Sequence, residues 1–190
     1  TTASGNVAVG LSALKANTTG SSNVSVGTTS LLNNTTGLQN TACGHQSLNA
    51  NTTASYNVAV GTNSLLANTT GTANTAVGAS ALQDNTTATH NTAVGNSALA
   101  NTTTGADNVA MGYSTMFTNT TGASNVAIGK ETLYANTSGQ NNVGVGFQPL
   151  ASNTEGTYNV GIGTRALQVN TTASYGVAIG AFALDANTTG

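Results

Sequence analysis

The chain has 190 residues, of which only 4% are charged and 4% aromatic, and its formal net charge is −2. Its three Lys and Arg residues cannot build the basic face that nucleic-acid binding or polybasic membrane attachment requires. No apolar run approaches the ~20 residues that span a bilayer, and the single cysteine excludes an intrachain disulfide framework. We therefore expect neither nucleic-acid binding nor membrane insertion by this segment.

The sequence repeats every 17 residues from one end to the other, and no insertion or deletion breaks the count. Each unit opens with Asn-Val-Ala-Val-Gly or a variant of it. Such strict phase indicates that every unit makes the same contacts with its neighbours, as in a solenoid. The units, numbered 1 to 11 with positions 1 to 17, begin at residues 6, 23, 40, 57, 74, 91, 108, 125, 142, 159 and 176.

We interpret residues 1–190 as a single repeat array. The first five residues match the end of a unit, and the last unit stops before its own end. A free solenoid is expected to carry terminal caps. We therefore expect the chain to be a fragment of a longer fibre.

Each unit begins with a predicted short strand. β-Branched residues at positions 2 and 4 alternate with small residues, which is typical of a strand with one buried face. We assign positions 2 and 4 to that buried face, and Cys43 at position 4 with them. Leu at position 9, on a second short extended segment, completes the core. For the first four units the predicted core is Val9, Leu14, Val26, Leu31, Leu48, Val60 and Leu65.

Two corners are predicted in each coil. Position 5 is Gly in all units, which indicates a positive φ at a site where no Cβ is tolerated. Asn-Thr-Thr-Gly at positions 12 to 15 matches a type I turn. The glycine corners of the first four units are Gly10, Gly27, Gly44 and Gly61.

Asparagine recurs at positions 1 and 12. Stacked coils would lie about 4.8 Å apart, the spacing of neighbouring strands. Each interior amide could then donate to one neighbour and accept from the other, which predicts two ladders along the rod. In the first four units these ladders consist of Asn6, Asn23, Asn40 and Asn57 at position 1 and of Asn17, Asn34, Asn51 and Asn68 at position 12.

These features predict an all-β chain, a β-solenoid or β-roll with one 17-residue coil per repeat. Three large apolar side chains per unit contribute roughly 1.5–3 kcal/mol each, whereas ordering the backbone costs roughly 1–2 kcal/mol per residue. Because this margin is small, we expect a homo-oligomer, preferably an intertwined or side-by-side homotrimer. We expect the chains to meet along the small residues of positions 3 and 8, such as Ala8, Ser25, Ala42, Ala13 and Ser30.

The unit also resembles known fibre repeats. Asn-Val-Ala-Ile-Gly at 125–129 and Asn-Val-Ala-Val-Gly at 6–10 and 57–61 are similar to head repeats of trimeric autotransporter adhesins of the Yersinia-adhesin type. The longer pattern at 74–87 is similar to repeats of bacterial and phage tail-fibre proteins. The resemblance covers the whole chain and implies a trimeric left-handed β-roll outside the cell or on a virion. Adhesin head repeats are typically shorter than the 17-residue unit of this chain, and the extra residues here fall near Asn-Thr-Thr-Gly.

No catalytic constellation is visible in the sequence. His45 and His90 lie more than two units apart, and the five acids occupy five different positions of the unit. General acid–base catalysis needs paired groups within reach of each other, so we predict no enzyme, no cofactor and no metal. Exposed aromatic side chains can stack on sugars or partner proteins. The candidate contact residues are Tyr56, Tyr113, Tyr134, Tyr158 and Tyr175, which do not form an obvious patch in the sequence.

The function that these features favour is a structural and adhesive extracellular fibre segment, the shaft or head of a surface adhesin or phage tail fibre. Its partners would be other copies of the chain and a host-surface receptor or glycan. One alternative is a self-assembling surface filament or matrix protein. The other is an ice-binding β-solenoid that uses its stacked Thr and Asn ladders.

Overall fold

The computed structural model describes residues 3–188, which form eleven short parallel strands and no helix. Each strand has three residues and occupies positions 2 to 4 of its unit. The strands are β1 (Val7–Val9), β2 (Val24–Val26), β3 (Thr41–Cys43), β4 (Val58–Val60), β5 (Thr75–Val77), β6 (Thr92–Val94), β7 (Val109–Met111), β8 (Val126–Ile128), β9 (Val143–Val145), β10 (Val160–Ile162) and β11 (Val177–Ile179).

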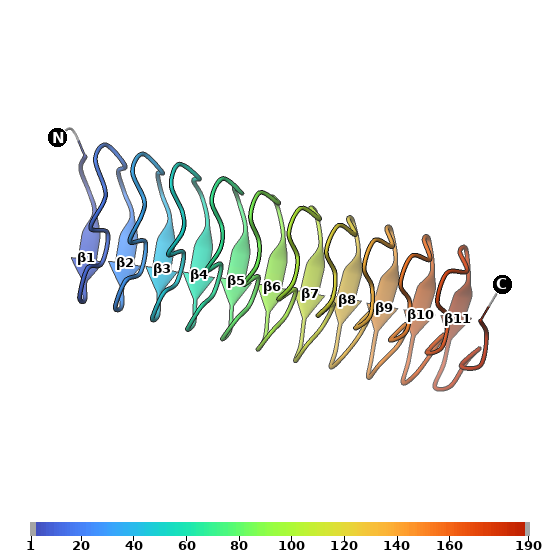
Figure 1. Ribbon diagram of the computed structural model, residues 1–190. Coiled ribbons are helices and arrows are strands. Elements are labelled where there is room, and N and C mark those ends of the chain that lie inside the picture. The colour runs from blue at the N-terminus through green and yellow to red at the C-terminus, as the bar shows by residue number, and fades with distance from the viewer. Residues whose placement is uncertain (1–2, 189–190) are drawn as a thin grey trace.

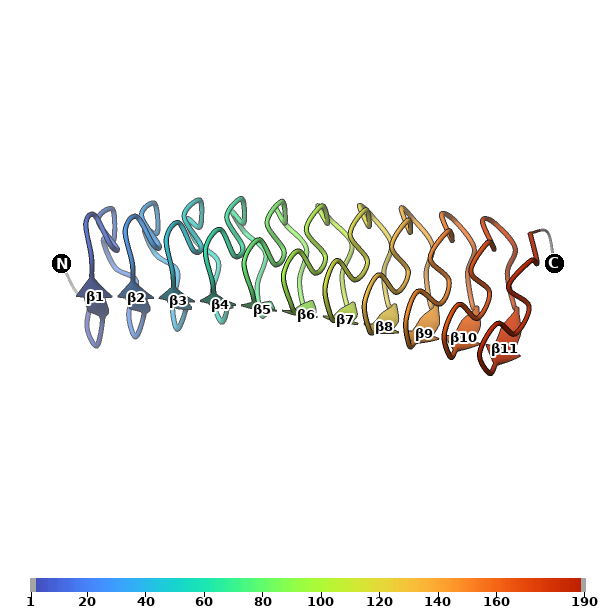
Figure 2. The same ribbon diagram turned by 90° about the horizontal axis from the view of Figure 1, so that it is seen from below.

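The strands form one sheet in their sequence order, each paired with the strand of the next unit. The register joins like positions, so that Ala42 pairs with Ala59 and Val58 with Thr75. Figure 1 shows the resulting rod, with the two termini at opposite ends. Figure 2 shows that the strands line one side of the rod while the turns form the rest. The predicted all-β solenoid with one 17-residue coil per repeat is therefore confirmed.

The predicted second extended segment is wrong, because positions 6 to 11 form a turn. Residues at position 9 have φ between 45° and 54° in every coil, although ten of them are Leu. A non-glycine residue costs roughly 1–2 kcal/mol in this left-handed conformation. The conformation points the side chain into the coil, where Leu31, Leu48 and Leu65 are fully buried. This burial offsets the backbone strain.

The predicted core is half right. Leu14, Leu31, Leu48 and Leu65 are buried.

The three valines predicted in the core are instead on the outer face of the sheet. Val9 is 58% exposed, Val60 is 36% exposed and Val26 is half-buried, and Cys43 is also exposed. Alternate residues of a strand point to opposite faces, and it is position 3 that points inward. The reason is volume: a Cβ added at Gly161 would already lie 3.2 Å from Leu150 Cγ. The narrow coil accommodates Gly, Ala or Ser opposite Leu but not a side chain as large as Val.

The same orientation overturns the predicted contact surface at positions 3 and 8. Ser25, Ser30 and Ala42 are completely buried inside their own coils, where another chain cannot reach them. Ala13 is half-buried, and Ala8 is exposed in the first coil. Small residues recur at these positions because they fit the interior of one chain.

The predicted glycine corner is confirmed. At position 5, φ lies between 120° and 140° in all eleven coils, including Gly10, Gly27, Gly44 and Gly61. A Cβ at Gly44 would lie 2.5 Å from the carbonyl oxygen of Gly61 in the next coil. Glycine is therefore required twice, by the backbone conformation and by the close approach of the neighbouring backbone.

Two glycines of the tenth coil allow this requirement to be tested. We expect Gly163→Ala to lower the free energy of unfolding by at least ~2 kcal/mol, because it combines a strained φ with an overlap against backbone. Its Cβ would lie 2.7 Å from the carbonyl group of Gly180. Gly161→Ala is the matched control and should change the free energy by less than about 1 kcal/mol. Urea denaturation followed by circular dichroism measures both, and equal effects would contradict the assignment of the corner.

Candidate functional site

The asparagines at position 1 form a continuous ladder. The backbone N–H of Asn40 donates to Oδ1 of Asn23 at 2.9 Å, and Asn40 Nδ2 lies 3.2 Å from the same oxygen. Asn40 Nδ2 also donates across its own coil to the carbonyl oxygen of Ala54 at 2.9 Å. Each of these amides therefore joins two coils and also ties the start of its coil to position 15.

The asparagines at position 12 form the second ladder. Asn51 Nδ2 donates to Oδ1 of Asn34 at 2.8 Å and to the carbonyl oxygen of Ala54 at 3.1 Å. One carbonyl thus accepts hydrogen bonds from both asparagines of its coil. The amides predicted for the first four units all take part, and Asn6 and Asn17 of the first coil are half-buried, whereas the others are fully buried: Asn23, Asn34, Asn40, Asn51, Asn57 and Asn68.

The Asn-Thr-Thr-Gly segment is a bend that is closed mainly by this side chain. Asn17 Nδ2 donates to the carbonyl oxygen of Gly20 at 2.9 Å. The backbone N–H of Gly20 donates instead to Thr35 in the next coil, at 3.2 Å. The bend is therefore stabilised by the asparagine and by stacking, rather than by a hydrogen bond within the backbone of the turn.

The first and third residues of every strand form an outer apolar stripe along the rod. The stripe contains Val, Ile, Met, Thr and Cys43, and none of its side chains is charged. Met111 and Ile128, near the middle of the rod, are as exposed as Val60. An uncharged apolar surface of this length is unusual for a monomeric soluble protein.

The candidate tyrosines differ in their surroundings. All five are exposed. Tyr158 and Tyr175 stack on each other with ring centroids 5.2 Å apart. Tyr113 and Tyr134 are 21 residues apart in the sequence but line the same pocket. Tyr56 lies in the third coil, away from both groups.

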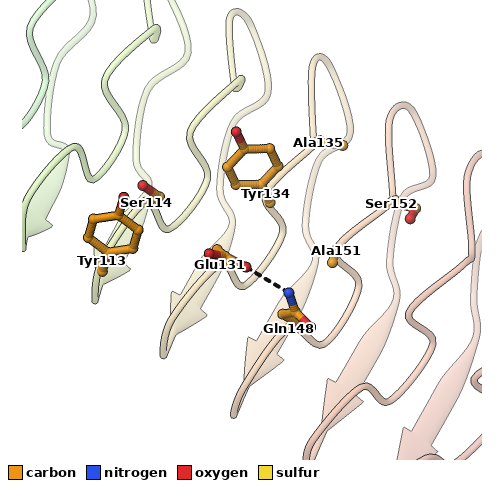
Figure 3. Close-up of a pocket in the computed structure, with 8 residues that line it drawn as sticks. All are labelled: Tyr113, Ser114, Glu131, Tyr134, Ala135, Gln148, Ala151 and Ser152. Atoms are coloured by element: carbon orange, nitrogen blue, oxygen red, sulfur yellow. Dashed lines mark hydrogen bonds between the residues drawn. The ribbon is translucent and has the colours of Figure 1, made fainter.

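The pocket spans coils 7 to 9 on the turn side of the rod and has a volume of about 480 Å³ (Figure 3). Small side chains in the ninth coil leave room beside the Tyr134 ring. The lining residues are Tyr113, Ser114, Glu131, Tyr134, Ala135, Gln148, Ala151 and Ser152. Sequence reasoning missed the polar ones. The 17-residue period was the available signal, because it places Glu131 and Gln148 at the same position of neighbouring coils.

Neighbouring side chains hold the pocket in shape. Phe117 stacks on Tyr134 with a centroid distance of 5.5 Å and an angle of 7° between the rings. Lys130 Nζ lies 5.8 Å from the ring centre of Tyr113 and 5.7 Å from that of Phe147.

The Glu131 carboxylate is fixed by two neighbours. Its Oε2 accepts a hydrogen bond of 2.6 Å from Gln148 Nε2, drawn as a dashed line in Figure 3. Its Oε1 lies 3.5 Å from Lys130 Nζ. Glu131 supplies the carboxylate of the pocket, and its two partners are an amide and an ammonium group. No second carboxylate lines the pocket.

The remaining titratable groups are dispersed. His90 Nδ1 lies 3.5 Å from Asp107 Oδ1 in an exposed pair, and His45 lies in another part of the rod. Within residues 3–188, no three His, Cys, Asp or Glu side chains gather in a way that could hold a metal ion. The same range has no helix that is long and apolar enough to cross a membrane.

Comparison of the chain with protein-family models, with curated proteins and with solved structures gives no match. The resemblance to adhesin and tail-fibre repeats therefore rests on the residues of the repeat.

One natural gap in the position-12 ladder provides a test of its strength. Thr102 replaces Asn there, so that Asn85 Oδ1 is buried without a hydrogen-bond partner, and Asn119 Nδ2 reaches Thr102 Oγ1 only at 3.4 Å. We expect Thr102→Asn to raise the free energy of unfolding by about 1 kcal/mol, because it supplies the missing donor.

The reverse change provides the control. Asn119→Thr would open a second gap beside the first and is expected to lower the free energy of unfolding by about 1–3 kcal/mol, the usual effect of an unpaired buried group. Urea denaturation measures both variants. Loss of stability in Thr102→Asn would show that the ladder contributes less than its geometry indicates.

Proposed function

We propose that the chain is a structural segment of an extracellular homo-oligomeric fibre, in which it acts as a stiff shaft or head that supports attachment to a surface. The observation that carries this proposal is the outer apolar stripe, which continues through all eleven strands. An isolated rod would leave this entire stripe in water.

The partner that fits the stripe is another copy of the chain. Each copy presents the same uncharged side chains at the same spacing along the rod, so two stripes match over their full length without repulsion between charges. The stripe offers two side chains from each of eleven strands. This number of contact residues is similar to that of a standard stable interface, which has about 20 to 30 residues on each side. Symmetric association of identical surfaces is the usual arrangement in soluble oligomers.

A parallel trimer around the stripes is the arrangement we favour. The resemblance to trimeric adhesin repeats supports the number three. Since all strands of one chain point the same way, parallel chains would keep every coil at the level of its copies. This arrangement would bury positions 2 and 4 and leave the turns outside.

The two asparagine ladders support the role of a shaft. Buried amides join each coil to the next, for instance Asn57 to Asn40 and Asn68 to Asn51. Bending the rod would stretch these hydrogen bonds together with those of the strands. The repeat therefore suits a rigid spacer that holds another part of a protein away from a cell surface or, as a virion tail fibre, away from a virion.

The two alternative functions, a surface filament and an ice-binding protein, would use the surfaces of the rod differently. A surface filament or matrix protein would also bury the stripe but would grow beyond a closed oligomer. For ice binding, the threonines of position 13 are the obvious row, but Thr35 Oγ1 donates to Thr52 and Thr52 Oγ1 donates to Thr69 within the rod. Ice binding stays a prediction, which thermal hysteresis of the purified rod can test.

The oligomer is tested by placing charges on the stripe. In solution the protein should have the mass of a closed trimer by light scattering. The double variant Val60→Asp, Met111→Asp places carboxylates in two coils of the stripe and should reduce the mass to that of a monomer, because like charges would meet at the axis. The matched control is Thr70→Asp, Thr121→Asp, on the exposed turns of the same two coils. A monomeric wild-type protein, or equal behaviour of both variants, would refute the stripe as an interface.

The direction of the chains is tested by the native cysteine. Cys43 is exposed on the stripe, so parallel chains in register would bring the Cys43 side chains of different copies together. Mild oxidation should then give a disulfide-linked pair, leaving one free thiol in each trimer. Cys43→Ser is the control without crosslinking. A trimer that gives no linked pair would contradict the parallel register, because shifted or antiparallel chains hold the thiols apart.

A further inference from the structure

We infer that the pocket of coils 7 to 9 is a binding site for a neutral oligosaccharide. This deepens the proposed fibre function by naming what the fibre attaches to, although the pocket is built from a single chain. Five of the chain's eight Tyr and Phe residues lie in these three coils: Tyr113, Phe117, Tyr134, Phe147 and Tyr158. Aromatic side chains are therefore concentrated in three of the eleven coils.

The aromatic rings supply the apolar part of the site. The Tyr113 side chain is 54% exposed and that of Tyr134 is 38% exposed, so both keep a surface for a ligand. Phe117 supports one ring and Lys130 lies against the other. A pyranose ring has an apolar face of C–H groups that packs on such a surface, and rigid rings lose little entropy in binding it.

Polar groups around the rings match the rim of a sugar. Tyr113, Ser114, Tyr134 and Ser152 each bring a hydroxyl group to the lining of the pocket. The hydrogen bond drawn among the lining residues in Figure 3 joins Gln148 to Glu131 and uses none of these hydroxyl groups. The Glu131 carboxylate is already oriented by Gln148 and can accept from further donors. A few convergent polar groups beside apolar walls are typical of a small-ligand site, and sugar hydroxyls can both donate to and accept from this set.

Other ligand classes fit less well. An anion would meet the Glu131 carboxylate. A cation would meet the Lys130 ammonium group, which already lies against Tyr113 and Glu131. A proline-rich peptide also packs on aromatic rings, but it offers few N–H donors to the acceptors of this pocket. A neutral polyhydroxyl ligand satisfies both the rings and the acceptors.

The experiment uses the whole protein and a glycan array containing neutral oligosaccharides of glucose, galactose and N-acetylglucosamine. We expect a subset to be retained, and titration calorimetry with a retained oligosaccharide should give one site per chain. Tyr134→Ala should weaken binding about tenfold through loss of the stacking surface. Glu131→Gln, which keeps the shape of the side chain, should weaken it several-fold. Tyr56→Ala removes a tyrosine of the third coil that is more exposed than Tyr134, at 59% against 38%, and should leave affinity unchanged.

The outcomes separate this site from the fibre proposal. Circular dichroism and light scattering on each variant show whether fold and mass are preserved. Retention of no neutral glycan, a folded Tyr134→Ala variant that binds like the wild type, or stronger binding of a polyproline peptide or choline would overturn the site. A monomer that binds the sugar at this pocket would leave the site in place and refute only the oligomer.

Discussion

The rod depends on a carbonyl group that two asparagines of the same coil share. Asn40 and Asn51 both donate to the carbonyl oxygen of Ala54, and each amide also bonds to its copy in the preceding coil. The coil is thereby closed across its interior by polar groups, in a space where unpaired amides would be costly. Because each ladder bond joins the same position of two neighbouring coils, the 17-residue period is fixed along the rod. Strand register, the glycine corner and the position of each Leu all follow from that fixed period.

The interior of each coil is narrow, and this explains which features of the fold could be predicted from the sequence and which could not. Periodicity alone indicated the solenoid, the asparagine ladders and the corner at Gly44, because each depends on like residues stacking on like. Alternation also located the strand, but it could not say which face points inward. Hydrophobicity favours Val inside and Ala outside, whereas the limited space opposite Leu48 requires the reverse. In a wider coil the larger side chains would fill the interior, so the error came from applying the rule for ordinary sheets to a very thin one.

The pocket was less accessible to sequence reasoning, since it depends on contacts between neighbouring coils rather than on any motif. Glu131 and Gln148 are separated by one full period and look unrelated along the chain, yet they share a hydrogen bond of 2.6 Å. Likewise Phe117 and Tyr134 stack because they occupy position 10 of successive coils. In a solenoid, residues one period apart are the true neighbours. The unit positions of Tyr113 and Tyr134, 6 and 10, follow from the repeat, but only the stacking of successive coils brings their side chains to one pocket.

The outer apolar stripe and the pocket occupy different parts of each coil, so that they can act together. The stripe lies on the strands at positions 2 and 4, while all the residues that line the pocket lie on the turn at positions 6 to 11, beyond the glycine corner. In the parallel trimer that we propose, the three chains would hold three pockets at the same height on a stiff rod. Weak binding of single sugars would then become strong attachment to a surface that displays many copies, because the second and third contacts form at high effective concentration. A regular shaft that carries one irregular patch per chain thus needs no high affinity in any single site.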